Sequence, residues 1–127
     1  YEFVCTHPNL PEDLIPYWDF DAVNIPHELR DASVAAIMAA ALYELSMYSN
    51  KAEYKETADK VMHSLSSSDY RSKIGENHNF LLMHSVGSYP HGSEIDVPLI
   101  YADYYFLEAL KRKRDCDIEA KSKSVQK

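Results

Sequence analysis

The amino-acid sequence predicts an all-α protein built from antiparallel helical hairpins. Two apolar helical segments flank one amphipathic helical segment, and a long irregular stretch precedes each apolar segment. Runs with the alternating pattern of strands are nearly absent. The chain has 127 residues, of which 46% are hydrophobic and only 3 are glycine, so we expect one domain with a real core.

The first apolar segment, Asp31 to Tyr48, reads DASVAAIMAAALYELSMY. Asp31 is a good N-cap, and the alanine, leucine, isoleucine and methionine residues that follow favour a helix. Apolar or small residues occupy every face of this helix. That pattern is typical of an inner helix with protein on most of its sides.

The second segment, Lys51 to Leu65, carries a single apolar stripe between charged residues and is therefore expected as an outer helix. The two-residue link Ser49-Asn50 is short enough to make the two helices antiparallel. The stripe is formed by Tyr54, Ala58, Val61, Met62 and Leu65.

The remaining chain predicts a break at residues 66–69, two helical turns at residues 80–84 and a loop in GSYPHGSEID. A second inner helix is expected from Pro98 to Lys113, with Asp96 as its cap and basic residues in its last turn. We expect residues 114–127 to form a basic tail, frayed or disordered, outside a domain of residues 1–113.

Inner helices of such an array run parallel, so the stretches 1–30 and 66–97 are expected to meet at one end of the molecule. Trp18 lies between Tyr17 and the carboxylates Asp19 and Asp21, and aromatic faces beside carboxylates are common in carbohydrate sites. The alternative interpretation is that Trp18 and Phe20 close the bottom of a core, with the aspartates capping or forming turns.

The second stretch carries polar residues that include His84, Tyr89, His91 and Ser93. The histidine spacing does not match a metal site, so ordinary polar histidines are the default interpretation. Arg30 beside Asp31 is most simply a salt bridge or a contact at the helix entry, although a guanidinium at this end would also suit an anionic ligand. Two carboxylates two residues apart are poor candidates for a glycosidase acid and base pair.

Charge and composition exclude several function classes. Thirteen basic and 20 acidic residues give a net charge of −7, and the acidic excess lies in residues 1–110, so we expect no nucleic-acid partner. We expect no membrane span, because no charge-free apolar run is long enough. Cys5 and Cys116 are expected as free thiols, and a chain that starts at Tyr1 is expected to be a processed or truncated piece.

Two long motifs carry a resemblance to a known family. The runs IPYWDFDA and IPHELRDASVAAIMAAALYELS, between Ile15 and Ser46, and HSVGSYPHGSEIDVPLIYADYYFLEAL, from His84 to Leu110, closely resemble the C-terminal part of glycoside hydrolase family 88, the unsaturated glucuronyl hydrolases. The resemblance covers about residues 1–113. It implies that this chain is the last third of an (α/α)6 toroid.

The resemblance also implies an activity for the whole protein. Family members remove the unsaturated uronic acid that polysaccharide lyases leave at the non-reducing end of oligosaccharides. An aspartate protonates the C4–C5 double bond, water adds at C5 and the ring opens, with no cofactor. The family's catalytic aspartates lie in the earlier half of the toroid, so we expect no catalytic residue, no metal site and no activity in this chain alone.

The resemblance places the GSYPHGSEID loop near the substrate pocket, where it helps to choose between sulfated and unsulfated sugars. The expected substrate-binding residues are Tyr89, His91 and Ser93, followed by Trp18 and Asp21, and then Arg30. The partner is an unsaturated uronyl oligosaccharide, and the compartment stays open between bacterial cytoplasm and periplasm. The alternative function is a non-catalytic helical module that binds carbohydrate or protein.

The apolar inner helices have one further consequence for a chain of this length. In a chain that forms only a third of a toroid, the surface that would contact the other helices is exposed to water. Exposed apolar patches favour association. We therefore expect the chain to associate with itself through that surface.

Overall fold

The computed structural model describes residues 1–49 and 51–125. Its helices are α1 (Glu2–Cys5), α2 (Ala32–Tyr48), α3 (Ala52–Leu65) and α4 (Ile100–Val125), with 3-10 turns η1 (Asn77–Asn79) and η2 (Tyr89–His91). The described residues form isolated β-bridges but no strand. The predicted all-α class is confirmed.

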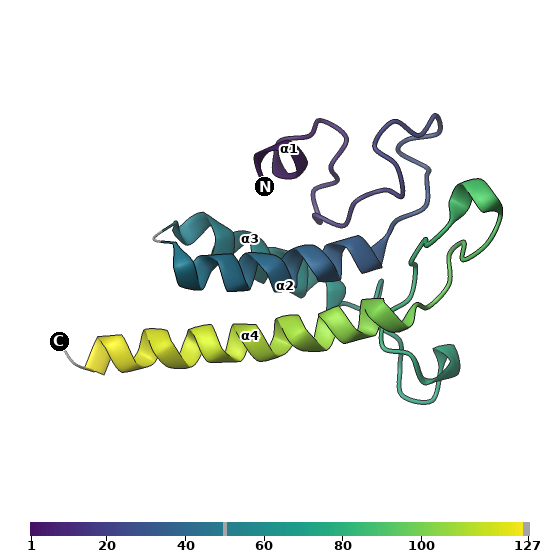
Figure 1. Cartoon of the computed structure of the whole chain (residues 1–127). Helices are drawn as coiled ribbons and strands as arrows, with labels where there is room; N and C mark the ends of the chain where they lie inside the picture. The colour runs from purple at the N-terminus through teal and green to yellow at the C-terminus, as the bar shows by residue number, and fades with distance from the viewer. Residues whose placement is uncertain (50, 126–127) are drawn as a thin grey trace.

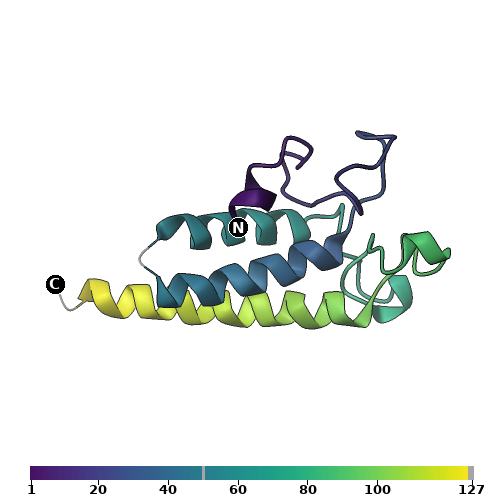
Figure 2. The same ribbon diagram turned by 45° about the horizontal axis from the view of Figure 1, so that its top comes forward.

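Helices α2, α3 and α4 form the body of the molecule, with α2 packed against both others (Figure 1). Helices α2 and α4 lie side by side and run in the same direction, while α3 runs antiparallel to them, as both ribbon views show (Figure 2). The predicted inner pair and outer helix are present. The irregular stretches before α2 and α4 lie at the end where these two helices begin, which we call the loop end.

The core lies along α2. Tyr43 of α2 and Leu65 of α3 are fully buried, and Phe106 of α4 is 4% exposed. The small side chains of buried alanines let the helices approach closely, and Arg112 of α4 donates from Nη1 to the carbonyl oxygen of Ala40 at 2.7 Å. The buried alanines of α2 are Ala32, Ala35, Ala36, Ala39 and Ala40.

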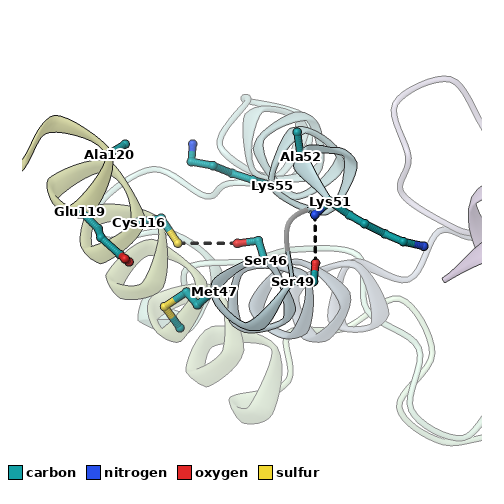
Figure 3. A pocket seen from close by; sticks show the side chains of 9 residues that line it. All are labelled: Ser46, Met47, Ser49, Lys51, Ala52, Lys55, Cys116, Glu119 and Ala120. Carbon is teal, nitrogen blue, oxygen red and sulfur yellow. Dashed lines mark hydrogen bonds between the residues drawn. The ribbon is translucent and has the colours of Figure 1, made fainter. Parts of the chain in front are cut away.

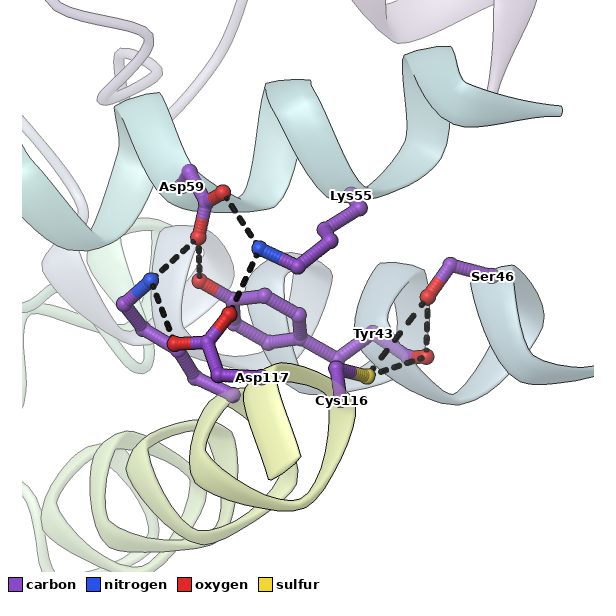
Figure 4. Close-up of polar contacts among 7 residues, drawn as sticks. Tyr43, Ser46, Lys55, Asp59, Cys116 and Asp117 are labelled. Atoms are coloured by element: carbon purple, nitrogen blue, oxygen red, sulfur yellow. Dashed lines mark hydrogen bonds and ion pairs between the residues drawn. The ribbon is translucent and has the colours of Figure 1, made fainter. Parts of the chain in front are cut away.

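A network of charges joins the three helices (Figure 4). The Tyr43 hydroxyl donates to Asp59 Oδ1 at 2.7 Å, and the ammonium groups of Lys55 and Lys113 each lie 2.8 Å from that carboxylate. Asp117 of α4 pairs with both lysines, at 3.0 Å and 3.4 Å. Burial alone would raise the pKa of Asp59, but the hydrogen bonds from Lys113, Lys55 and Tyr43 lower it to about 2.

The same network corrects the prediction for the C-terminal residues. Helix α4 continues through Val125, so the expected boundary at residue 113 is not where the helix ends. Beyond that boundary Cys116 is buried, and Asp117 forms an ion pair with Lys55 of α3. These contacts stabilise the helix although its sequence lacks an apolar pattern there. The last two residues of the expected tail, 126 and 127, lie outside the described residues. Both cysteines are free thiols, as expected.

Two further predictions before α4 are wrong. Residues 80–84 form no helix, because the buried carboxylate of Asp103 accepts the backbone N–H groups of Leu81 at 2.7 Å and Leu82 at 2.9 Å. Asp96 does not cap α4, which begins four residues later. Its Oδ1 instead lies 2.7 Å from His84 Nδ1, and both residues have positive φ angles.

Candidate functional site at the loop end

The two irregular stretches meet at the loop end, as the parallel inner helices predicted. The indole of Trp18, from the first stretch, stacks on the ring of Tyr89, from the second, with 4.1 Å between centroids and 17° between planes. Trp18 is partly buried and Tyr89 is 40% exposed. The stack therefore presents aromatic surface to solvent, mainly from Tyr89.

The first stretch is folded back on itself between Tyr17 and Arg30, which form an antiparallel bridge. The backbone N–H of Trp18 donates to the carbonyl oxygen of Leu29 at 3.0 Å. Above this bridge, Glu28 Oε2 accepts the indole N–H of Trp18 at 3.0 Å. The indole is therefore held from its edge by Glu28 and on its face by Tyr89.

The second stretch forms a closed loop, residues 87–94. Gly87 N–H donates to the carbonyl oxygen of Glu94 at 2.8 Å, and Ser93 N–H donates to that of Ser88 at 3.3 Å. A Cβ atom at Gly87 would lie only 2.2 Å from Glu94 Oε2, so a larger residue at this position would displace the Glu94 side chain. The tip carries the exposed His91, whose Nδ1 lies 2.9 Å from Ser88 Oγ, and the exposed Ser93.

Asp31 fastens both stretches to α2. Its carboxylate caps the helix by accepting Ser33 N–H at 3.0 Å, as predicted, and it also accepts Val86 N–H at 3.4 Å. The backbone adds a second link, since Ala32 N–H donates to the carbonyl oxygen of His84 at 2.9 Å. The capping pattern was visible in the sequence, whereas the link to residue 86 was not.

The guanidinium of Arg30 contacts other residues of the chain and stabilises the first stretch. Its Nη1 lies 2.8 Å from Asp13 Oδ1 and donates to the carbonyl oxygen of Ile15, and the guanidinium sits 4.8 Å from the ring centre of Tyr17. Partial burial would raise the pKa of Asp13, but hydrogen bonds from Arg30, Ile15 N–H and Tyr70 lower it. The salt-bridge interpretation of Arg30 is the one the geometry favours.

Asp19 and Asp21, which follow Trp18, lie in a turn. Asp19 Oδ1 accepts the N–H of Asp21 at 2.9 Å, and both residues are exposed. In the part of the chain that the structure describes, no contact joins the Asp21 side chain to the stack. Phe20 is partly buried and stacks on His7 at 4.2 Å, so it belongs to the packing of the first stretch.

A cavity of about 470 Å³ lies at the opposite end of the helices, away from these loops (Figure 3). It opens between the end of α2, the start of α3 and α4, and its lining includes Lys51, Lys55 and Cys116. Lys51 pairs with Glu53, Lys55 pairs with Asp59, and Cys116 Sγ contacts Ser46 Oγ and the carbonyl oxygen of Tyr43. The contacts of these groups are with other residues of the chain, so we place the candidate site at the loop end.

No three histidine, cysteine, aspartate or glutamate side chains among residues 1–49 and 51–125 are placed to hold a metal ion. No helix in this part of the chain combines the length and the apolar character that crossing a membrane requires.

Comparison with known proteins decides the family. No protein-family model matches the chain. The unsaturated glucuronyl hydrolase of Formosa agariphila is 48% identical over 114 residues, which is 90% of this chain and 28% of that protein. A crystal structure of an unsaturated glucuronyl hydrolase specific for heparin superposes with a TM-score of 0.89 and 48% identity. The chain is therefore homologous to a part, about 28%, of an unsaturated glucuronyl hydrolase.

Other unsaturated glucuronyl hydrolases agree with this assignment. A structure from Streptococcus agalactiae, complexed with dGlcA-GalNAc6S, has a TM-score of 0.73 and 31% identity over 84% of this chain. The chain covers 29% of that structure and 32% of the heparin-specific one, so it spans less than a third of either. The hairpins described above are part of the (α/α)6 toroid of unsaturated glucuronyl hydrolases.

Proposed function

We propose that the chain forms the C-terminal part of a glycoside hydrolase that removes unsaturated uronic acid from the non-reducing end of lyase-made oligosaccharides. The observation that carries the proposal is the Trp18 and Tyr89 stack at the end where both inner helices begin, in a chain 48% identical to an unsaturated glucuronyl hydrolase. Stacked aromatic rings suit the apolar faces of sugar rings.

Four residues present groups of the right chemistry at the loop end. Tyr89 offers a ring face, and His91 and Ser93 offer donors and acceptors for sugar hydroxyl or sulfate groups. Trp18 supports Tyr89 from behind. Asp21 is exposed on the same stretch and is a weaker candidate, whereas Arg30 is engaged by Asp13 and is assigned a structural role.

The chemistry itself is assigned to carboxylates outside this chain. The proposed reaction adds water across the C4–C5 double bond, with a proton from an aspartate, and differs from displacement at the anomeric carbon by two carboxylates. Asp31 and Asp103 are buried and committed to backbone N–H groups. The role of this chain is therefore to hold the sugar beside the catalytic groups.

A chimera tests the proposal directly. The matching segment of the Formosa agariphila enzyme is replaced by this chain, and unsaturated disaccharides from different lyases are offered as substrates. Loss of absorbance from the conjugated double bond reports turnover. We expect the chimera to turn over at least one disaccharide and the 127-residue chain alone to turn over none.

Variants of the chimera locate the sugar site. Tyr89→Ala is expected to raise KM about tenfold, because a buried aromatic contact to the sugar is lost. His78→Ala, an exposed histidine in η1, is the matched control and should leave KM unchanged. A folded chimera without activity, combined with binding of saturated and unsaturated sugars alike, would favour the non-catalytic module. Turnover by the chain alone would refute the placement of the catalytic carboxylates.

We further propose that the isolated chain associates with itself through the open flank of α2 and α4. Large apolar side chains on these helices are exposed although the helices form the inner layer, among them Tyr104, which is 60% exposed, and Leu107, which is 54% exposed. Contiguous apolar surface of this kind favours association.

A further inference from the structure

We infer that Glu28 is a positioning residue, which holds the Trp18 indole flat against Tyr89 and thereby fixes the 87–94 loop. Its consequence for sugar binding rests on the proposed function. The Glu28 contacts themselves do not depend on that function.

Glu28 uses both carboxylate oxygens across the same turn. Oε2 accepts the indole N–H of Trp18 at 3.0 Å, while Oε1 accepts the backbone N–H of Asn24 at 3.3 Å and its side-chain amide at 3.0 Å. Hydrogen bonds to an ionised acceptor are stronger than neutral ones. The bond from Trp18, with smaller contributions from Asn24, keeps the pKa of Glu28 below its ordinary value, so the carboxylate is charged at neutral pH.

The bond to the indole fixes a specific degree of freedom. An indole ring has a single donor and no acceptor, so one acceptor at its edge restricts rotation of the ring about the Cβ–Cγ bond of Trp18. Rotation of the Trp18 ring would break the 17° alignment with Tyr89. Glu28 therefore acts on Tyr89 through Trp18, without touching it.

Tyr89 belongs to the same loop as His91 and Ser93, so a fixed Tyr89 ring also restricts the position of that loop. The loop base is closed by Gly87 and Glu94, but its tip projects from the body, and residues 89–94 are exposed. The Trp18 ring is the aromatic contact that joins this tip to the first stretch. Loss of the contact would remove this link between the tip and the first stretch, and the sugar would have to order the tip on binding.

The first experiment uses the 127-residue chain, in which Trp18 is the only tryptophan. Tryptophan emission and the long-wavelength edge of the near-ultraviolet circular dichroism report on the indole, whereas the ten tyrosines contribute at shorter wavelengths. We expect Glu28→Ala to lose the indole dichroism band and to change the emission, and Glu28→Gln, which keeps an acceptor oxygen, to restore most of both. Glu56→Ala removes an exposed carboxylate from α3 and serves as the control for charge.

The second experiment uses the chimera and separates binding from chemistry. Glu28→Ala is expected to raise KM for the unsaturated disaccharide about tenfold with kcat within about twofold, because the loop must be ordered by the sugar. Glu28→Gln should return KM to within about threefold of the parent chimera.

The outcomes distinguish the two proposals. An unchanged dichroism band in Glu28→Ala, or failure of Glu28→Gln to restore it, overturns the positioning role. A changed band with unchanged KM overturns the link from the stack to the sugar. An inactive parent chimera contradicts the proposed function, while the spectroscopic test of Glu28 still stands.

Discussion

At the scale of single residues, buried carboxylates connect segments that are distant in the sequence. Asp103 on α4 accepts two backbone N–H groups from residues 81 and 82, and Asp31 accepts one from residue 33 and one from residue 86. Such bonds satisfy backbone groups that would otherwise be buried without partners. They allow a non-helical chain to pack against the start of an inner helix.

Removing the Asp103 carboxylate tests this role. Asp103→Ala leaves the N–H groups of Leu81 and Leu82 without their acceptor, and we expect the free energy of unfolding to fall by about 2 kcal/mol. Asp103→Asn keeps one acceptor oxygen and should lose about half as much. Urea unfolding measures both values, with the exposed Asp69→Ala as control. Equal stability of Asp103→Ala and Asp69→Ala would contradict the role.

The sequence pointed to Trp18 and Tyr89 but not to Glu28 or Asp103. An aromatic residue between carboxylates is a recognisable local pattern. Asp103 accepts backbone N–H groups more than 20 residues away, and Glu28 accepts the indole N–H of a residue 10 positions away, and neither contact leaves a local pattern. Arg30 shows the same limit. The sequence left both an internal contact and an anionic ligand open for Arg30, and only the structure identifies Asp13 as its partner.

At the scale of secondary structure, the sequence predicted α2 and α3 to within one residue, because a cap and a clear apolar pattern define them. It predicted helix α4 to start two residues too early and to stop too soon. The helix continues because Lys113 and Asp117 bond to the Asp59 network on neighbouring helices. Ion pairs between helices cannot be predicted from the spacing of apolar residues within one helix.

The Asp59 network predicts a specific pH dependence. The folded pKa of Asp59, about 2, lies below its ordinary value of 3.8, so its stabilising contribution is present above 3.8 and is lost as the pH falls toward 2. Because the side chain is 35% exposed, we expect a contribution of only about 1 kcal/mol after screening by solvent.

Comparison of the parent chain with Asp59→Asn measures this contribution. The difference in their free energies of unfolding should shrink by about 1 kcal/mol between about pH 5 and about pH 2. Asp69→Asn, which removes an exposed carboxylate, should show no such change. A pH-independent difference between the parent chain and Asp59→Asn would contradict the depressed pKa.

At the scale of the whole molecule, α2 and α4 are two helices of the toroid's inner layer, and large apolar side chains are exposed along both. They are Val34, Ile37, Leu45, Met47 and Tyr48 on α2, and Ile100, Tyr101, Tyr104, Leu107, Leu110 and Ile118 on α4.

Sedimentation velocity tests the proposed self-association. The parent chain is expected to sediment as a dimer or larger species, and Leu107→Glu, which places a charge in the middle of the α4 face, should shift it to monomer. Lys60→Glu on the exposed side of α3 is the matched control and should not change the distribution. A monomeric parent chain at all concentrations would refute the proposal.

The closed base of the 87–94 loop has a consequence for protein engineering. Gly87 and Glu94 join the two ends of the loop by a backbone hydrogen bond, and the tip between them carries the side chains proposed to face the sugar. The tip can therefore be exchanged between relatives as a cassette, provided that Gly87, Glu94 and an aromatic residue at position 89 are kept. Libraries that vary residues 88 and 90–93 would sample sugar preference without disturbing the helices.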